Sequence, residues 1–316
     1  MHDKVAKARS HRSPWARRVA LTRHRAGRLD PAVQGLLWTL VAGICFVLLN
    51  TLSRYLTTQI DPMQSQFLRY FCGLLVMLPL LWRSGLAAYK PRHIGGQFLR
   101  GLVHTAALGL WFVALPHISL ADMTALGFTT PIFIMIGAWL FLREPMRWER
   151  WLAALVGFSG VLIVVGPQLS GSGGYYSLVM LASSPVFAAS FLITKALTRY
   201  EKAGVIVLWQ SITVTLLSLP LALLHWQAPT LAQWVGYLAC GLLGSSAHYC
   251  LTRSYGVADI SATQSLKFLD LVWATLMGWL VFSDQPSHYT LMGGLLISAS
   301  TLWIARRESR RATARA

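Results

Sequence analysis

The chain alternates long apolar segments with short polar connections. A membrane-spanning helix needs about 17–25 predominantly apolar residues, and ten segments come near that length. They are 33–56, 63–82, 98–116, 122–142, 151–167, 175–197, 205–225, 232–251, 260–282 and 289–305. None alternates apolar and polar residues as a transmembrane strand does, and backbone groups in lipid must be hydrogen-bonded within the segment. The pattern therefore predicts ten transmembrane helices.

Composition supports the same class of protein. Hydrophobic residues make up 55% of the chain, charged residues only 12%, and the mean hydropathy is +0.51. So few polar side chains cannot cover the surface of a water-soluble globule of this size. We therefore expect an all-α polytopic membrane protein.

Basic residues are distributed very unevenly between the connections. The connections after the first, third, fifth, seventh and ninth segments hold no Lys or Arg. The two termini, the remaining connections and the segment ends that adjoin them hold 25 of the 28 basic residues, among them Arg100, Arg150, Lys195 and Arg253. Since Lys and Arg concentrate on the cytoplasmic side of a membrane, we expect a multi-pass protein of the inner (plasma) membrane with both termini in the cytoplasm.

The net charge of +17 follows from this asymmetry and from a basic N-terminal arm, residues 1–32. Such cations are attracted to anionic lipid headgroups. The arm lacks the interleaved aromatic residues of a nucleic-acid-binding segment, so we expect a lipid bilayer with anionic headgroups as its partner, and no nucleic acid. Four cysteines lie within apolar segments without metal-type spacing. They predict no disulfide, metal site or cofactor.

An internal repeat divides the chain. Residues 101–164 align without a gap on residues 241–304, and Phe128 then falls on Phe268. The repeat predicts two five-helix halves, 33–167 and 175–305, joined by an external linker, 168–174, and followed by a basic cytoplasmic tail, 306–316. Because five is odd, the second half enters the membrane from the opposite side. Inverted repeats of this kind are typical of secondary transporters that work by alternating access.

Several motifs resemble those of the drug/metabolite transporter superfamily, EamA family. They are Phe-Leu-Arg-Tyr at 67–70, Phe-Leu-Arg-Glu-Pro at 141–145 and its weaker copy Phe-Ser-Asp-Gln-Pro at 282–286. Within the family, the segments 99–101 and 267–272 look most like the S-adenosylmethionine uptake carriers. The resemblance implies a transporter of a small metabolite. Its other branches imply an amino-acid or metabolite exporter, or a riboflavin-type carrier, as alternatives.

Ionisable residues deep in the membrane are costly and are functional candidates by default. Asp270 lies near the centre of the ninth segment, and Lys267, three residues earlier, lies on the same helix face. Gln264 continues that polar stripe, and Thr130, next to Pro131, occupies the position equivalent to Asp270 in the first half. The group predicts a substrate site in which Asp270 binds a cationic group or carries a proton. A self-satisfied ion pair between Asp270 and Lys267 is the alternative.

Three further polar residues lie on the first two segments. Arg69 lies too deep to reach the external interface, and its planar fork suits a substrate carboxylate. A packing role, with the guanidinium bonded to backbone carbonyls, is equally compatible with its position. Arg54 lies near the outer end of the first segment, can reach the interface and is interpreted as a gate residue or as a side chain that extends to the interface. Asn50, one turn earlier, shares its face and is a candidate for substrate binding.

Aromatic and histidine residues complete the candidates. Trp111 could stack on a planar ligand, and Tyr249 is adjacent to His248. His104 and His248 lie at similar depth in the third and eighth segments and are candidates for proton coupling. Hydrogen-bonded structural roles are the alternative for both. The substrate expected from these residues is a zwitterionic or cationic molecule with a heterocyclic part, such as S-adenosylmethionine.

The sequence pattern fits two other classes of function, an enzyme and a channel, less well. A polytopic enzyme acting on lipid-linked substrates needs clustered acids, histidines or nucleophiles in loops, or a metal motif. The loops here are short and poor in acids, so we expect no enzyme activity and no catalytic residue. A channel is disfavoured because no pore loop or charged ring recurs. Small residues in the fifth and tenth segments, including Gly157, Gly160, Gly293 and Gly294, predict a close helix contact within a scaffold or a homodimer face.

Overall fold

A computed structural model describes residues 30–57, 59–114, 126–127, 129–145, 147–165, 174–282 and 288–313. Every regular element in these ranges is a helix. The elements are α3 (Pro31–Thr57), α4 (Pro62–Ser84), the short 3-10 helix η1 (Leu86–Tyr89), α5 (Ile94–Ala114), α7 (Thr130–Leu142), α8 (Trp148–Val165), α9 (Gly174–Leu197), α10 (Ala203–Leu224), α11 (Leu231–Val257), α12 (Ile260–Lys267), α13 (Leu269–Phe282) and α14 (His288–Thr313). The all-helical prediction is confirmed for this part of the chain.

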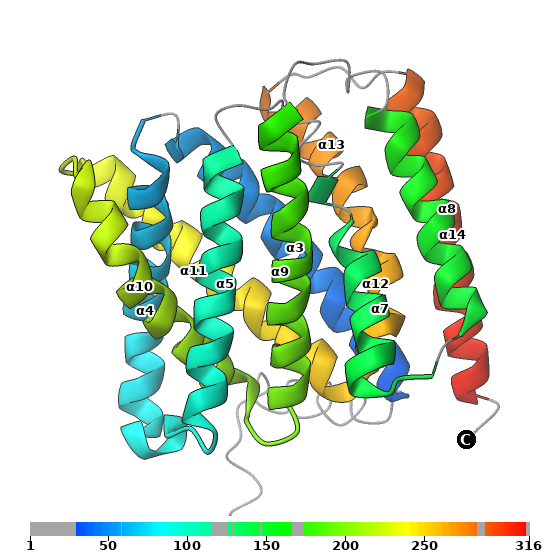
Figure 1. The fold of residues 1–316 in the computed structure, drawn as a ribbon, viewed down its shortest axis with the longest axis horizontal. Coiled ribbons are helices and arrows are strands. Elements are labelled where there is room, and N and C mark those ends of the chain that lie inside the picture. The colour runs from blue at the N-terminus through cyan, green and yellow to red at the C-terminus, as the bar shows by residue number, and fades with distance from the viewer. Residues whose placement is uncertain are drawn as a thin grey trace, which may run out of the picture.

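The helices stand side by side in one bundle, with α8 and α14 paired at one edge (Figure 1). The connections from α4 to α5, from α7 to α8 and from α9 to α10 lie at the lower end in this view, as does the C-terminal end of α14. The turns from α3 to α4 and from α10 to α11 lie at the upper end. The lower connections are therefore those that carry the basic residues.

The outside of the bundle is apolar. Four helical segments within the described residues are long and apolar enough to cross a membrane, namely Pro31–Thr57, Pro62–Ser84, Leu178–Leu197 and Ala203–Leu224. Large hydrophobic side chains such as Trp82, Phe141 and Leu231 point outward. A surface of this kind fits hydrocarbon as its solvent.

The main helix contacts come in matching pairs. Helix α3 packs against α11, and α9 packs against α5. An offset of 140–141 residues relates α3 to α9 and α5 to α11, so the second contact is the counterpart of the first. The contacts of α4 with α11 and of α10 with α5 form another such pair. Each half of the sequence therefore packs mainly against the other half.

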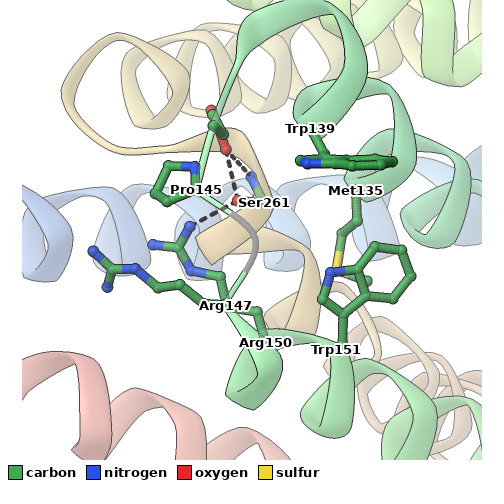
Figure 2. A pocket seen from close by; sticks show the side chains of 8 residues that line it. Met135, Trp139, Pro145, Arg147, Arg150, Trp151 and Ser261 are labelled. Carbon is green, nitrogen blue, oxygen red and sulfur yellow. Dashed lines mark hydrogen bonds between the residues drawn. The ribbon is translucent and has the colours of Figure 1, made fainter.

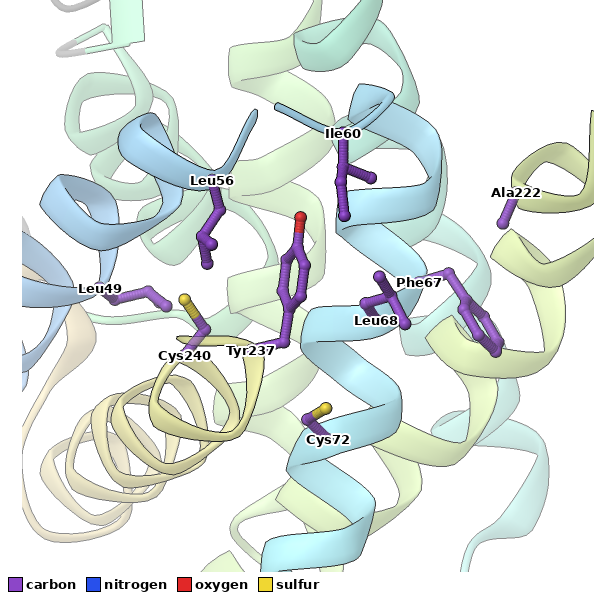
Figure 3. Packing of buried hydrophobic residues seen from close by; sticks show 9 residues of the cluster. All are labelled: Leu49, Leu56, Ile60, Phe67, Leu68, Cys72, Ala222, Tyr237 and Cys240. Carbon is purple, nitrogen blue, oxygen red and sulfur yellow. The ribbon is translucent and has the colours of Figure 1, made fainter. Parts of the chain in front are cut away.

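One core cluster shows how tightly these helices meet (Figure 3). Leu49 and Leu56 of α3 face Leu68 of α4, and Tyr237 of α11 extends between them. The Tyr237 hydroxyl lies 2.7 Å from the hydroxyl of Ser65. A polar group in an apolar cluster thus finds a partner on the neighbouring helix, as burial requires.

Helices α8 and α14 pack on each other through small residues. An added Cβ at Gly160 would lie 2.9 Å from the carbonyl oxygen of Gly293 and 2.8 Å from Ile297. Gly294, by contrast, faces open space. The close contact predicted at these glycines is therefore made within the chain at Gly160, whereas Gly294 has no part in it.

The ninth predicted span is interrupted. The sequence predicts one helix over 260–282, but α12 ends at Lys267 and α13 begins at Leu269. Phe268, between them, is fully buried against Gly157 of α8, where a side chain on the glycine would overlap its ring. In the first half, α7 begins at Thr130, the position equivalent to Asp270. Helices in the two halves therefore begin at nearly equivalent positions.

Candidate transport site

The interruption places an ion pair inside the bundle. Nζ of Lys267 lies 3.4 Å from a carboxylate oxygen of Asp270. The ammonium also lies 4.8 Å from the ring centroid of Phe46 on α3, a cation–π contact. The Asp270 carboxylate packs against Gly43, where any side chain would displace it. The predicted pairing of Asp270 with Lys267 is present, and α3 closes over it.

Two buried, uncharged polar side chains lie near the ion pair, Gln264 of α12 and Tyr255 of α11. Gln264 is buried, and its amide nitrogen donates to the Ile260 carbonyl at 2.8 Å. Apart from each other, its carbonyl oxygen and the buried Tyr255 hydroxyl have no hydrogen-bond partner within the described ranges. The side chains of Tyr255 and Gln264 lie close enough to interact with each other. A ligand that bonds to both would lower the cost of burying these polar atoms.

A buried arginine joins three helices. Arg100 of α5 is only 1% exposed. Its guanidinium donates to Thr194 of α9 at 2.5 Å, to the Ile206 carbonyl of α10 at 3.1 Å and to the Gln210 side chain at 2.6 Å. All three acceptors are uncharged. The positive charge is hydrogen-bonded but not neutralised.

The two candidate histidines meet in the centre. The rings of His104 on α5 and His248 on α11 lie 5.5 Å apart, edge to face. His104 is 3.0 Å from the Tyr70 hydroxyl and 3.2 Å from the hydroxyl of Ser190. The Gln210 amide nitrogen lies 3.4 Å from both Tyr70 and His248. These side chains form one hydrogen-bonded network that continues to Arg100, and it fits either the structural or the proton-coupling interpretation.

Arg69 lies next to this network on α4. Its guanidinium carbon is 5.2 Å from the centroid of the Tyr70 ring. Together with residues of α10 and α11 it lines a small cavity. The alternative in which backbone carbonyls hold Arg69 finds no support, because no hydrogen bond joins it to a carbonyl of the described residues.

A second polar cluster lies at the end of the bundle that carries the basic connections. Glu144, after α7, accepts hydrogen bonds from the backbone N–H groups of Ile260 and Ser261 at 2.8 and 3.1 Å. Arg150 of α8 donates to the Ser261 hydroxyl at 2.7 Å and pairs with Asp259 at 3.1 Å. Figure 2 shows the Arg150 guanidinium next to Ser261 in the pocket formed there. The cluster caps the N-terminus of α12 and fixes the start of the interrupted span.

The remaining predicted residues are more dispersed. Trp111 packs beside Tyr70 on the margin of the central network. Tyr249 is 41% exposed and meets Trp38 of α3 edge to face. Asn50 is exposed on α3, and Thr130 is half-buried at the start of α7. The side chain of Arg54 lies outside the described residues.

The sequence analysis missed three members of the central network. The sequence pattern places Arg100 among the cytoplasmic cations, and it does not indicate Tyr70 or Gln210 as site residues. A signal existed for Gln210, because the repeat aligns it with Arg69. For Arg100, the i, i+4 spacing to His104 on one helix face was the available signal. Within the described part of the chain no group of three His, Cys, Asp or Glu side chains could hold a metal ion.

An apolar helical bundle whose two halves pack through matching contacts around a polar interior is typical of a membrane transporter. The chain belongs to the EamA-like transporter family, whose family model matches residues 33–166 and 174–306. This confirms the resemblance found in the sequence motifs.

Relatives from several bacteria share most of the chain. A riboflavin transporter of Rhizobium johnstonii is 35% identical over 283 residues, covering 89% of this chain and 93% of the relative. An S-adenosylmethionine uptake transporter of Rickettsia prowazekii is 26% identical over 282 residues, covering 89% and 96%. A pseudopaline exporter of Pseudomonas aeruginosa is 26% identical over 279 residues, covering 88% and 98%. One solved crystal structure is similar with a TM-score of 0.75 at 18% identity, covering 88% of this chain and 98% of that chain, which shows a common fold.

Proposed function

We propose that the chain carries a small heterocyclic metabolite across the inner membrane by alternating access, with the substrate held beside the interrupted ninth span. The ion pair Lys267–Asp270, held inside the bundle at the boundary between α12 and α13, is the observation that carries the proposal. Carrier sites lie near the bilayer midplane where spans are interrupted at corresponding positions of two halves. Asp270 at the start of α13 and Thr130 at the start of α7 occupy such positions.

Riboflavin or a similar neutral heterocycle is the first candidate substrate. The relatives named riboflavin transporters support it, one of them sharing 35% of its residues with this chain. The site chemistry supports it as well. Asp270 and Lys267 neutralise each other, while the carbonyl oxygen of Gln264 and the hydroxyl of Tyr255 have no other hydrogen-bond partner within the described residues than each other. A ring edge carrying both donors and acceptors pairs such groups without needing a charge of its own.

A zwitterion such as S-adenosylmethionine is the second candidate. It is favoured by the ion pair itself, because a ligand with both signs of charge can replace each partner of Lys267–Asp270. The distance of 3.4 Å between their charged atoms is long for a charge-assisted hydrogen bond. Exchanging that contact for two ligand contacts therefore costs less than opening a tight pair.

The proposal includes a membrane topology. Two inverted five-helix halves, 33–167 and 175–305, would give ten spans with both termini in the cytoplasm. The paired helix contacts support this arrangement, since each contact has a counterpart at the repeat offset. The basic arm and tail would lie on anionic headgroups. A homodimer, if formed, would use a surface other than the contact of α8 with α14, which is occupied within the chain.

Removal of the carboxylate tests the site. We expect Asp270→Asn to abolish uptake of the substrate into proteoliposomes, while the protein still inserts and purifies folded. The reason is that the amide cannot hold Lys267 as an ion pair or bind a cationic group. Thermal stabilisation by riboflavin, S-adenosylmethionine, nucleosides and amino acids, measured on both proteins, identifies the substrate class.

Asp61→Asn is the matched control. Asp61 accepts hydrogen bonds from the N–H groups of Met63 and Gln64 at the start of α4, and asparagine caps a helix equally well. This variant should transport like the wild type. Normal transport by Asp270→Asn would refute the assignment of the site to the ninth span.

A further inference from the structure

We infer that the recess around Arg69 is a binding subsite for an oxyanion, the carboxylate or phosphate group of a ligand. The inference deepens the proposed function by adding a second subsite, and its role in transport rests on that proposal. The subsite itself is defined by contacts that do not involve Asp270.

Arg69 presents an unpaired cation to a hollow. Its side chain is half-buried, and no hydrogen bond or ion pair joins it to any residue that the structure describes. The hollow is lined by Arg69, Tyr70, Gly73, Val207, Ser211, Gly241, Gly244, Ser245 and His248. Helices α4, α10 and α11 therefore supply its walls.

Glycines bring the walls of the hollow close together. A Cβ added at Gly244 would lie 3.7 Å from Nε of Arg69, and one added at Gly73 would lie 3.2 Å from the Ser245 hydroxyl. Side chains at these two positions would therefore press against both donors. The Ser245 hydroxyl makes no hydrogen bond to a described residue, so it remains a donor for a ligand. The Ser211 hydroxyl, in contrast, donates to the Val207 carbonyl at 3.1 Å.

The balance of charge in the interior calls for an anion. Within the described spans, the cations facing this region are Arg69, Arg100 and Lys267. Asp270 is the carboxylate among them, and it is paired with Lys267. Arg100 bonds only to uncharged oxygens. Since an uncompensated charge is costly in a membrane, an anion at Arg69 is the group that the site lacks, and the guanidinium fork matches two oxygens of a carboxylate or phosphate.

The subsite adjoins the Lys267–Asp270 site. The Phe46 ring is 5.1 Å from the His248 ring, and Nζ of Lys267 is 4.8 Å from the Phe46 centroid. Phe46 and His248 thus stand between the two subsites. The oxyanion has two conceivable sources. It belongs to the transported metabolite, which then spans both subsites, or it is a free anion bound beside a neutral substrate.

Inorganic phosphate and acetate alone provide the first test. The purified protein is titrated with each at constant ionic strength, with chloride as the reference, and its thermal stabilisation is recorded. We expect a saturable stabilisation that chloride does not give. Arg69→Gln should weaken the apparent affinity by about tenfold or more. Arg253→Gln is the matched control, because this substitution removes the same charge at a residue that lies over Trp38, outside the recess. The Arg253→Gln variant should bind the anions like the wild type.

Further variants keep the test decisive. Arg69→Lys retains the charge without the planar guanidinium group. This variant should bind the oxyanion more weakly than the wild type, even if Arg69→Gln does not fold. Absence of an oxyanion-specific stabilisation in the wild type would overturn the inference, as would wild-type affinity in both Arg69 variants. Because no flavin is present, this outcome is independent of whether riboflavin is the substrate.

A pair of flavins then distinguishes the sources. If the oxyanion belongs to the metabolite, riboflavin 5′-phosphate should compete with inorganic phosphate, and Arg69→Gln should weaken its binding but not that of riboflavin. If the anion is free, riboflavin and phosphate should bind together and stabilise the protein additively. Either result supports the subsite. Failure of both flavins to bind, with phosphate binding intact, would refute the proposed substrate and leave the subsite standing.

Discussion

The environment of single charged residues decides how this chain uses them. Arg100 and Lys195 appear from the sequence as cytoplasmic cations at the ends of apolar segments. In the structure Arg100 is fully buried in the central network, and Lys195 donates to the backbone carbonyls of Tyr255 and Ala258 at the end of α11. Both side chains satisfy main-chain or side-chain acceptors of neighbouring helices, so neither is available mainly for lipid headgroups.

The buried guanidinium gives a prediction at this scale. Arg100→Lys should lower the free energy of unfolding by about 1–3 kcal/mol, because an ammonium cannot reach Thr194, the Ile206 carbonyl and Gln210 together. Thermal unfolding of the purified variant measures this loss. Arg92→Lys, at an exposed position, should unfold like the wild type. Equal unfolding temperatures for Arg100→Lys and the wild type would show that the three hydrogen bonds contribute nothing.

At the scale of elements, interruption and capping shape the candidate site. Glu144 and Arg150 hold the start of α12, and burial of Phe268 against Gly157 ends its regular course at Lys267. The sequence predicts the polar stripe of this span but not the break. Phe268, the residue at this boundary, packs against Gly157, and that contact exists only once α8 is in place.

The contact of α8 with α14 gives the second prediction. Gly160→Ala should lower the free energy of unfolding by about 1–3 kcal/mol, as overpacking does, because the new methyl group meets the Gly293 backbone. Gly294→Ala has nothing within 4 Å of its Cβ, so it should be neutral or slightly stabilising. Thermal unfolding of the two variants side by side makes the comparison. If both behave alike, the two helices do not pack as described.

At the scale of the whole molecule, the basic connections lie at one end of the bundle (Figure 1). By the positive-inside rule we expect this end to lie in the cytoplasm. A reporter that works only outside the cytoplasm should give a signal when it is fused at Ser172. A reporter that works only in the cytoplasm should give a signal when it is fused after Ala316. A cytoplasmic signal at Ser172 would contradict the ten-span topology.

The sequence by itself determined the class of protein, the helical secondary structure of the described residues and the candidate pair Lys267–Asp270. These features follow from local properties, since apolar length, helix periodicity and the count of charges need no knowledge of neighbouring helices.

The tertiary structure decided which distant polar groups meet. Arg100 and Gln210 are 110 residues apart in the chain, and His104 meets His248 across two different helices. It also decided that Arg69 faces a hollow while Tyr249 faces outward. The physical reason is that such contacts depend on how helices from the two halves pack, at glycines such as Gly73 and Gly241 where backbones approach closely. That packing depends on all the helices together and cannot be derived from one segment.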